Sequence, residues 1–138
     1  MYHTNRSKLT DGLGVSPNQI AIASQATVYT SALKIGAMSA MSLAIYLTGS
    51  SPNVKVELQV SDTAPSALEN LNDSVGIDWC IQEGGAPIFT AITDNVLHKI
   101  TLSPVVCEYV RLKITGNSGN GAGVVAFASI VEQMQLGV

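Results

Sequence analysis

Tyr109-Val110-Arg111-Leu112-Lys113-Ile114-Thr115, residues 109–115, is the stretch that decides the fold of this chain. Its apolar and polar residues alternate: Val110, Leu112 and Ile114 fall at one parity, and Arg111, Lys113 and Thr115 at the other. Successive side chains of a β-strand point to opposite faces, so this alternation predicts a strand with one face in a core and the other in water. The run ends at Gly116-Asn117-Ser118-Gly119, whose composition is typical of a turn.

The same period-two pattern recurs earlier in the chain. Residues 41–47 and 54–61 repeat it most clearly, with these inward positions: Met41, Leu43, Ile45 and Leu47, then Val54, Val56, Leu58 and Val60. Residues 48–53 between them are rich in Gly, Ser, Pro and Asn, so we expect the two strands to form an antiparallel pair joined by a turn. Weaker alternation over residues 20–35 and 96–102 predicts further strands.

Two features mark the C-terminal part. Residues 116–123 contain four glycines and two asparagines, which predicts a loop with large backbone freedom, either a hairpin loop or a flexible contact surface. Between Val124 and Leu136 the apolar parity changes part-way, from Val125 and Phe127 on one face to Ile130 on the other. A strand with a β-bulge would explain this change.

These segments together predict an all-β chain. About eight short strands with long loops and almost no helical signal point to an antiparallel β-sandwich, of jelly-roll type in the sharper form of the prediction. We expect this domain to span residues 20–138. Residues 1–19 are polar and contain Gly12, Gly14 and Pro17, so they suit an N-terminal arm that is either mobile or ordered on a neighbouring subunit.

Composition narrows the classes of function. Of 138 residues, 46% are hydrophobic and 12% charged, with a net charge of −3 and scattered basic residues. We therefore expect no nucleic-acid groove, which needs clustered Lys and Arg, and no membrane span, because no apolar run approaches ~18 residues. So few charges indicate either a neutral Ser, Thr and Asn surface or a surface buried against partners. No secretory signal follows Met1, so Cys80 and Cys107 are expected as free thiols.

Catalytic and metal-binding constellations are weak. His98 alternates with apolar residues and is expected at the edge of the core with a hydrogen-bond partner, and no zinc set accompanies it. Carboxylates at Asp62, Asp73, Asp78 and Glu83 would suit a calcium ion or a solvated acidic loop, without the spacing of a calcium motif. Serines lack a nucleophile elbow. We therefore expect no enzyme, no cofactor and no metal.

Several segments resemble the discoidin-like, or galactose-binding-like, jelly-roll family. The similar pieces, which cover roughly residues 41–136, are Val56-Glu57-Leu58-Gln59-Val60-Ser61-Asp62 followed by Trp79, Ile100-Thr101-Leu102-Ser103-Pro104 leading to Glu108-Tyr109-Val110-Arg111, and Phe127-Ala128-Ser129-Ile130-Val131-Glu132. The resemblance implies a jelly roll. It also offers one function, a carbohydrate-binding module using Asn117, Asn120 and Trp79, although the parity of Trp79 also suits the core.

As a whole, a short, charge-poor jelly roll with a polar arm is similar to the cement, or decoration, proteins of tailed-phage capsids. That resemblance implies a structural protein on the virion surface, made in the host cytoplasm, that bridges major capsid subunits or other assembly subunits as a homo-oligomer, a dimer or a trimer. We expect the partner interface on the arm and the loop tips, at Tyr2, Arg6, Leu9, Leu13, Asn117 and Asn120. A glycan ligand belongs to the carbohydrate-binding alternative.

Overall fold

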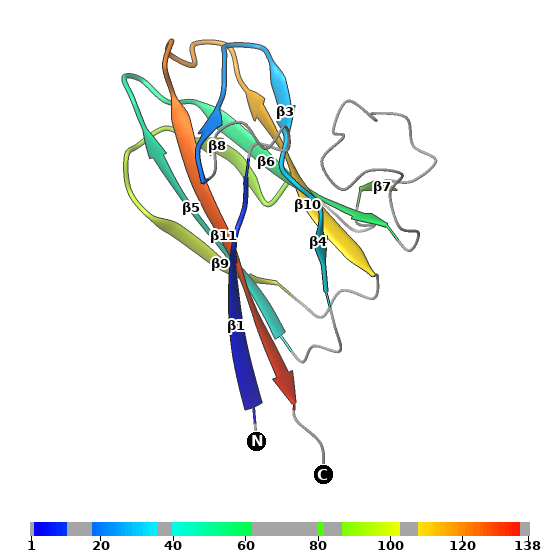
Figure 1. Cartoon of the computed structure of the whole chain (residues 1–138). Coiled ribbons are helices and arrows are strands. Elements are labelled where there is room, and N and C mark those ends of the chain that lie inside the picture. The colour runs from blue at the N-terminus through cyan, green and yellow to red at the C-terminus, as the bar shows by residue number, and fades with distance from the viewer. Residues whose placement is uncertain are drawn as a thin grey trace.

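A computed structural model describes residues 2–10, 18–35, 40–61, 80–81, 87–102 and 108–135. These residues form two antiparallel sheets and contain no helix, so the all-β sandwich is confirmed (Figure 1). Sheet A consists of β1 (Tyr2–Lys8), β2 (Ile20–Ala21), β5 (Ala40–Thr48), β9 (His98–Leu102) and β11 (Val125–Gln135). Sheet B consists of β3 (Thr27–Tyr29), β4 (Leu33–Lys34), β6 (Val54–Ser61), β7 (Cys80–Ile81), β8 (Phe89–Ile92) and β10 (Tyr109–Gly116).

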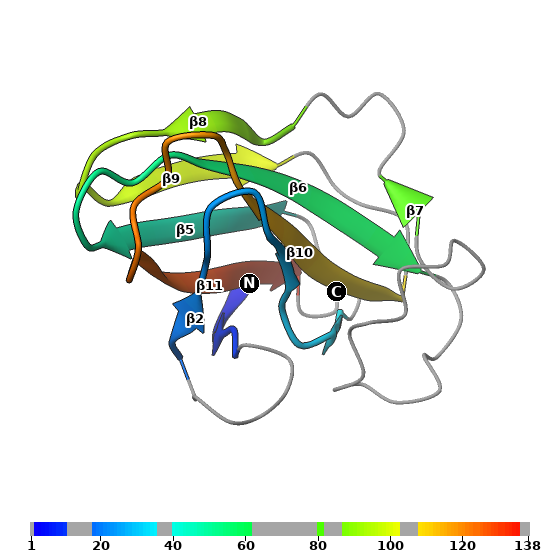
Figure 2. The ribbon, with the colours of Figure 1, turned by 90° about the horizontal axis from the view of Figure 1, so that it is seen from above.

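The strand order is that of a jelly roll. Sheet A runs β1-β11-β5-β9, with β2 continuing the line of β1 along β11. In sheet B, β10 lies between β6 and the β3 and β4 pair, and β8 lies on the far side of β6. The chain changes sheet between β2 and β3 (Figure 2), between β4 and β5, between β5 and β6, between β8 and β9, between β9 and β10, and between β10 and β11. Repeated crossing of this kind is characteristic of double-sheet jelly rolls.

The predicted inward faces form the core. Val110, Leu112 and Ile114 are fully buried, and the inward residues of β5 and β6 pack against them. Small residues of β11, such as Ala126 and Ala128, complete the layer between the sheets. Each strand therefore contributes alternate residues to one shared core, as the period-two pattern predicts.

The hairpin predicted between residues 41–47 and 54–61 is wrong, and of the two alternatives for residues 116–123 the hairpin is wrong. β5 pairs with β11 and β9, whereas β6 pairs with β10, so residues 49–53 connect the two sheets instead of turning within one. Residues 117–124 likewise connect β10 in sheet B to β11 in sheet A. Turn composition marks where a strand ends, but it does not determine which strand the chain pairs with next.

The bulge predicted in β11 is also absent. Its register is regular against both β5 and β1, and its even-numbered residues from Ala126 to Glu132 point inward. The apparent change of parity arises because Val125 and Phe127 are apolar residues on the outer face of sheet A. This half of β11 is apolar on both faces.

Arg111 corrects the expectation that the second face of β10 lies in water. Its side chain is fully buried, its Nε–H donates a 2.7 Å hydrogen bond to Gln59 Oε1, and its guanidinium carbon lies 4.3 Å from the centre of the Tyr29 ring. Arginine tolerates such a site because its planar group can stack on an aromatic ring while its N–H groups donate hydrogen bonds.

Part of the expected N-terminal arm belongs to the sandwich. Residues 2–8 form β1, which pairs with β11 from Tyr2 opposite Gln135 to Lys8 opposite Ser129. Leu9 follows with its side chain in the core, and its N–H donates to Ala128 O at 2.9 Å. β1 and the second half of β11 lie side by side and antiparallel, so the start of β1 and the end of β11 are at the same end of the molecule (Figure 1).

Candidate functional site

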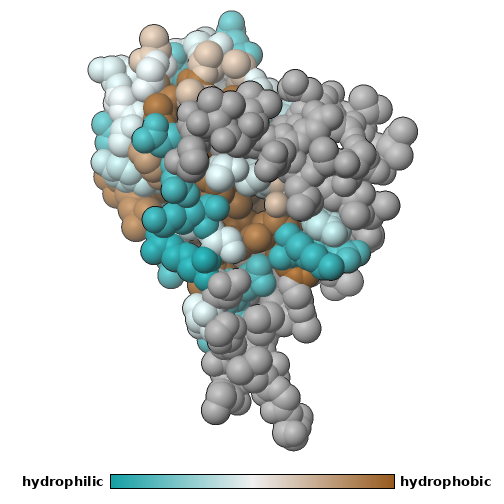
Figure 3. Space-filling view, in the orientation of Figure 1, coloured by the Kyte–Doolittle hydropathy of each residue, from teal (hydrophilic) through white to brown (hydrophobic). Residues whose placement is uncertain are grey.

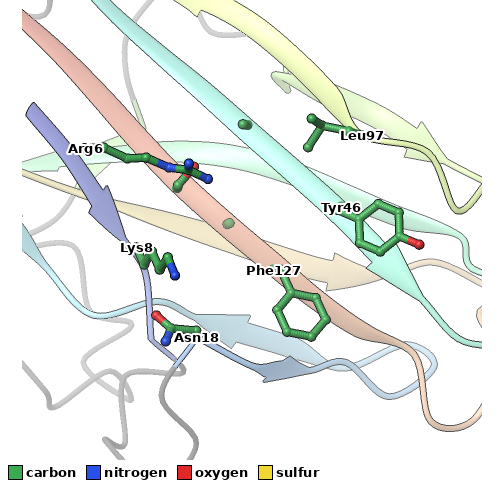
Figure 4. A pocket seen from close by; sticks show the side chains of 9 residues that line it. Arg6, Lys8, Asn18, Tyr46, Leu97 and Phe127 are labelled. Carbon is green, nitrogen blue, oxygen red and sulfur yellow. The ribbon is translucent and has the colours of Figure 1, made fainter. Parts of the chain in front are cut away.

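The outer face of sheet A carries an exposed cluster that we call the face patch: Arg6, Lys8, Tyr46, Leu97 and Phe127. Among described residues, the exposed large hydrophobic side chains are Tyr46, Val96, Leu97 and Phe127, and three of these four belong to the patch. Tyr46 and Phe127 are 36% and 37% exposed, and Leu97 is 63% exposed. Figure 4 shows their side chains above the sheet, with Arg6 and Lys8 projecting from β1.

The strand register explains how the patch is built. Phe127 and Tyr46 are directly opposite each other on β11 and β5, and Leu97 immediately precedes β9 beside them. Cross-strand neighbours on one face lie about 4.5–5.5 Å apart at Cβ, so these three side chains form one apolar row across the sheet.

The next row has a cation at both ends, and the row after it has a cation at the β1 end. Lys8 is opposite Ser129, Ser129 is opposite Ala44, and Ala44 is opposite Lys99, which places a lysine at each end of a row whose centre is small. Arg6 lies one row further along, opposite Val131. The small centre leaves a groove of about 260 Å³ beside the aromatic row, with Ala44 and Ser129 among its lining residues (Figure 4).

The groove suits contact with another surface better than enclosure of a small molecule. Its volume lies below the roughly 300–1,000 Å³ of typical small-ligand pockets. Hydrophobic and hydrophilic residues lie side by side on the molecular surface (Figure 3). Aromatic residues and arginine are enriched at protein interfaces, where they bury large areas and donate several hydrogen bonds.

The interface residues expected on the arm have different positions. Arg6 is exposed and belongs to the face patch, whereas the Leu9 side chain is buried in the core of this chain. The backbone of Tyr2 lies at the start of β1, opposite Gln135, and Leu13 lies outside the described residues. A partner role for these residues stays a prediction. In the described structure, the Leu9 side chain is part of the core.

Asn117 and Asn120 lie together at the loop end of the sandwich. Asn120 is 5% exposed: its Oδ1 accepts from the Asn53 N–H at 2.9 Å, and its Nδ2 donates to Ile22 O at 2.9 Å. Asn117 Nδ2 donates to Asn53 Oδ1 at 3.0 Å and to Thr90 O at 3.1 Å. These amides bind the neighbouring loops to one another, and Trp79, their expected companion in glycan binding, lies outside the described residues.

His98 occupies the predicted core-edge position. It is the inward residue at the start of β9, and its Nε2–H donates to Asp94 Oδ1 at 2.6 Å. Its ring packs edge-on against Phe89 with centroids 5.7 Å apart. A structural histidine with a hydrogen-bond partner is therefore confirmed.

The carboxylates considered as calcium ligands are not among the described residues. Within the described ranges no three His, Cys, Asp or Glu side chains gather in a possible metal site. Asp62, Asp73, Asp78 and Glu83, together with Cys107, lie outside those ranges.

Sequence reasoning identified Arg6 but missed the rest of the face patch. The available signal was the change of parity in β11, because Val125 and Phe127 are apolar at positions where a half-buried strand would be polar. Tyr46 gave the same signal on β5, since it stands between inward Ile45 and Leu47. Apolar residues at the outward parity of two adjacent strands predict an exposed hydrophobic patch.

Comparison with known proteins identifies no family. No protein-family model matches the chain, and no curated protein matches it. Solved structures similar to it include a Bacillus endospore appendage described as a disulfide-linked pilus, at 7% identity and a TM-score of 0.43, covering 99% of this chain and 90% of the other. A family two carbohydrate esterase from Cellvibrio japonicus matches at 15% identity and a TM-score of 0.41, covering 98% of this chain and 35% of the other.

Tomato Aspermy Virus supplies a third match, at 14% identity and a TM-score of 0.38, covering 99% of this chain and 78% of the viral chain. These are distant matches to β-sandwich proteins.

In the part of the chain that the structure describes, no helix is long and apolar enough to cross a membrane. The molecule is thus an antiparallel jelly-roll β-sandwich with an apolar and cationic patch exposed on one sheet.

Proposed function

We propose that this chain is a non-enzymatic structural protein that attaches to a larger assembly through the face patch. The observation that supports this most directly is the row of Tyr46, Phe127 and Leu97, exposed in register on adjacent strands of a sheet whose other face completes the core. The paired strands fix the positions of these side chains, while the other face of the sheet packs in the core. Burial of about 800 Å² per partner would make an ordinary specific interface.

The assembly that we propose is a viral capsid, with the chain on its outer surface and the major capsid protein as its partner. The support is the small, compact jelly roll together with a composition of 46% hydrophobic and 12% charged residues. Desolvating neutral groups costs less than desolvating charges, and small contacts repeated around a shell add through multivalency. In this proposal the chain is itself a dimer or trimer and is made in the host cytoplasm.

Site-specific photo-crosslinking tests attachment through the patch. A photo-reactive phenylalanine analogue replaces Tyr46 in one variant and Lys113, on the outer face of sheet B, in a control. We expect the Tyr46 variant to crosslink a partner in the cells that make the protein, and the Lys113 variant to give no such product. Equal crosslinking from both positions, or none from Tyr46, would contradict a role for this face.

Quantitative mass spectrometry tests the capsid itself. Virus particles purified on a density gradient are expected to contain the chain in a fixed ratio to the capsid subunit. If intact particles lack the chain while the cells contain it, the capsid role is wrong, even where crosslinking from Tyr46 succeeds.

A further inference from the structure

The charged strand residues on the outer face of sheet A have one sign. Arg6, Lys8 and Lys99 all lie on the outer face of sheet A, and all three are exposed. No strand position on this face that the structure describes carries a carboxylate. Yet the whole chain has ten acidic and seven basic residues, for a net charge of −3. The outer face of sheet A is therefore positively charged, although the net charge of the chain is negative.

Two cations of sheet B lie beside carboxylates. Lys34 Nζ lies 3.5 Å from Glu108 Oε1, and Lys55 Nζ lies 3.5 Å from Glu57 Oε1. Over the described residues, no ion pair is formed by the three cations on the outer face of sheet A. An exposed set of like charges without local partners creates a positive potential that attracts an acidic surface.

From this asymmetry, and resting on the proposed function, we infer that the face patch binds an acidic protein surface in which carboxylates surround an apolar side chain. The apolar side chain would enter the groove over Ala44 and Ser129, against Tyr46 and Phe127. The carboxylates would then reach the cations at the ends of the neighbouring rows. Arg6 can bind a carboxylate through two N–H groups, which makes it the strongest single determinant.

Other classes of partner match the face less well. Polybasic membrane sites usually have about four to eight Lys or Arg residues, more than this face presents. A glycan needs hydrogen-bonding groups around its hydroxyls. Arg6, Lys8 and Asn18 line the groove at its edge, but most of its lining surface is apolar, with Tyr46, Phe127 and exposed Leu97 forming the adjoining row. An aliphatic side chain of a protein suits that row better.

A second copy of the chain is also a poor match in its described part. Glu57 and Glu108 already form ion pairs, and Asp94 is hydrogen-bonded to His98. Glu132 is buried on the inner face of β11. These four described carboxylates have partners within the chain or lie in its core. The occupant that we assign is a different, acidic protein.

Selection from a displayed library of random short peptides against the immobilised full-length chain tests the inference. We expect the selected peptides to combine Asp and Glu with a central apolar residue. Their affinity, measured by fluorescence anisotropy, should fall about tenfold or more between about 0.05 and 0.3 M sodium chloride, since salt screens exposed charge pairs. Selected peptides that are neutral or basic, no selected peptides, or affinity independent of salt would each overturn it.

Matched variants connect binding to the named cations. Arg6→Gln with Lys8→Gln should weaken the peptide about tenfold and flatten its salt dependence, while Lys113→Gln on sheet B should leave both unchanged. Arg6→Glu with Lys8→Glu should instead bind a peptide whose acidic residues are replaced by lysine. The side chains of Arg6 and Lys8 are exposed and that of Lys113 is half-buried, and circular dichroism verifies that all variants fold. Equal effects from both sheets, or failure of this charge-reversed pair, would overturn the inference.

Vesicles of phosphatidylserine and phosphatidylcholine, and soluble polygalacturonate, are the two remaining probes. Binding of either at the patch in preference to the acidic peptides would overturn the protein assignment. The proposed function has a separate readout: crosslinking from Tyr46 that persists in the Arg6→Gln, Lys8→Gln variant, at high salt, would leave attachment standing while removing its electrostatic basis.

Discussion

At the scale of single residues, Gly121 has no room for a side chain. A Cβ built on it would lie 1.9 Å from Ser50 O, because the Gly121 N–H donates to Ser51 O at 2.9 Å and holds the two loops together. Gly116 meets Ala23 O at 2.1 Å in the same way. We therefore expect Gly121→Ala to lower the free energy of unfolding by about 2–3 kcal/mol, through overpacking against backbone that cannot move aside. Urea denaturation measures the change.

Gly119 is the matched control in the same loop. It has a φ of +88°, but a Cβ there would meet no heavy atom within 4 Å. Asn adopts positive φ more readily than most residues, so Gly119→Asn should cost less than about 1 kcal/mol. Equal destabilisation by the two substitutions would contradict close approach to Ser50 O as the reason for glycine at position 121.

Arg111 is the second residue whose chemistry can be tested. Arg111→Lys keeps the positive charge but removes the planar stack on Tyr29 and the hydrogen bond from Nε to Gln59. We expect a loss of about 1–3 kcal/mol in the free energy of unfolding, since hydrogen bonds to charged groups contribute this much. Lys113→Arg, on the same face of β10, is the control and should be nearly neutral. A stable Arg111→Lys variant would contradict the stacking argument.

At the scale of elements, β1 is part of the sandwich and Leu9 secures its end. We expect Leu9→Ala to destabilise the fold by about 2–4 kcal/mol, because it removes a buried side chain from the core. Lys8→Ala changes an exposed neighbour and should alter stability by less than about 0.5 kcal/mol. Thermal unfolding of the two variants distinguishes a strand from a detachable arm: an unchanged melting temperature for Leu9→Ala would indicate the arm.

The elements that sequence could predict are those with one clear inner face. β5, β6 and β10 each have one continuous apolar face, and the residues of that face are in the core. Pairing could not be predicted, because the turn after β5 has the composition of a hairpin whether the chain returns to the same sheet or crosses to the other. β1 could not be predicted either, since a short polar edge strand has little alternation and is defined by its pairing with β11.

The candidate site was harder to predict for a related reason. Its residues come from four strand regions, and only the register brings Phe127 opposite Tyr46 and Lys8 opposite Ser129. Sequence gives the parity of each residue but not its neighbours across the sheet. The burial of Asn120 could not be predicted either. A loop asparagine normally faces water, yet this one is buried and hydrogen-bonded to backbone groups of two other loops.

At the scale of the whole molecule, the loop end and the outer faces of the two sheets differ in structure. Close contacts at Gly116, Gly121 and Asn120 fix the loop end, which leaves little freedom there for adapting to a ligand. The outer face of sheet A has exposed cations and exposed apolar residues in regular rows. Arg111 stacks on Tyr29 across the outer side of sheet B. The patch on sheet A is therefore the surface most suited to a partner among the described residues.

The solution mass of the chain tests the proposal at this scale. So low a charged fraction, 12%, leaves neutral surface whose burial costs little desolvation, so we expect multi-angle light scattering to give two or three times the chain mass of 14.4 kDa. Because the face patch is assigned to a different protein, the Arg6→Gln, Lys8→Gln variant should keep the wild-type mass. A single species of 14.4 kDa would contradict the dimer or trimer. A wild-type oligomer that the variant reduces to that mass would place the self-contact on sheet A instead.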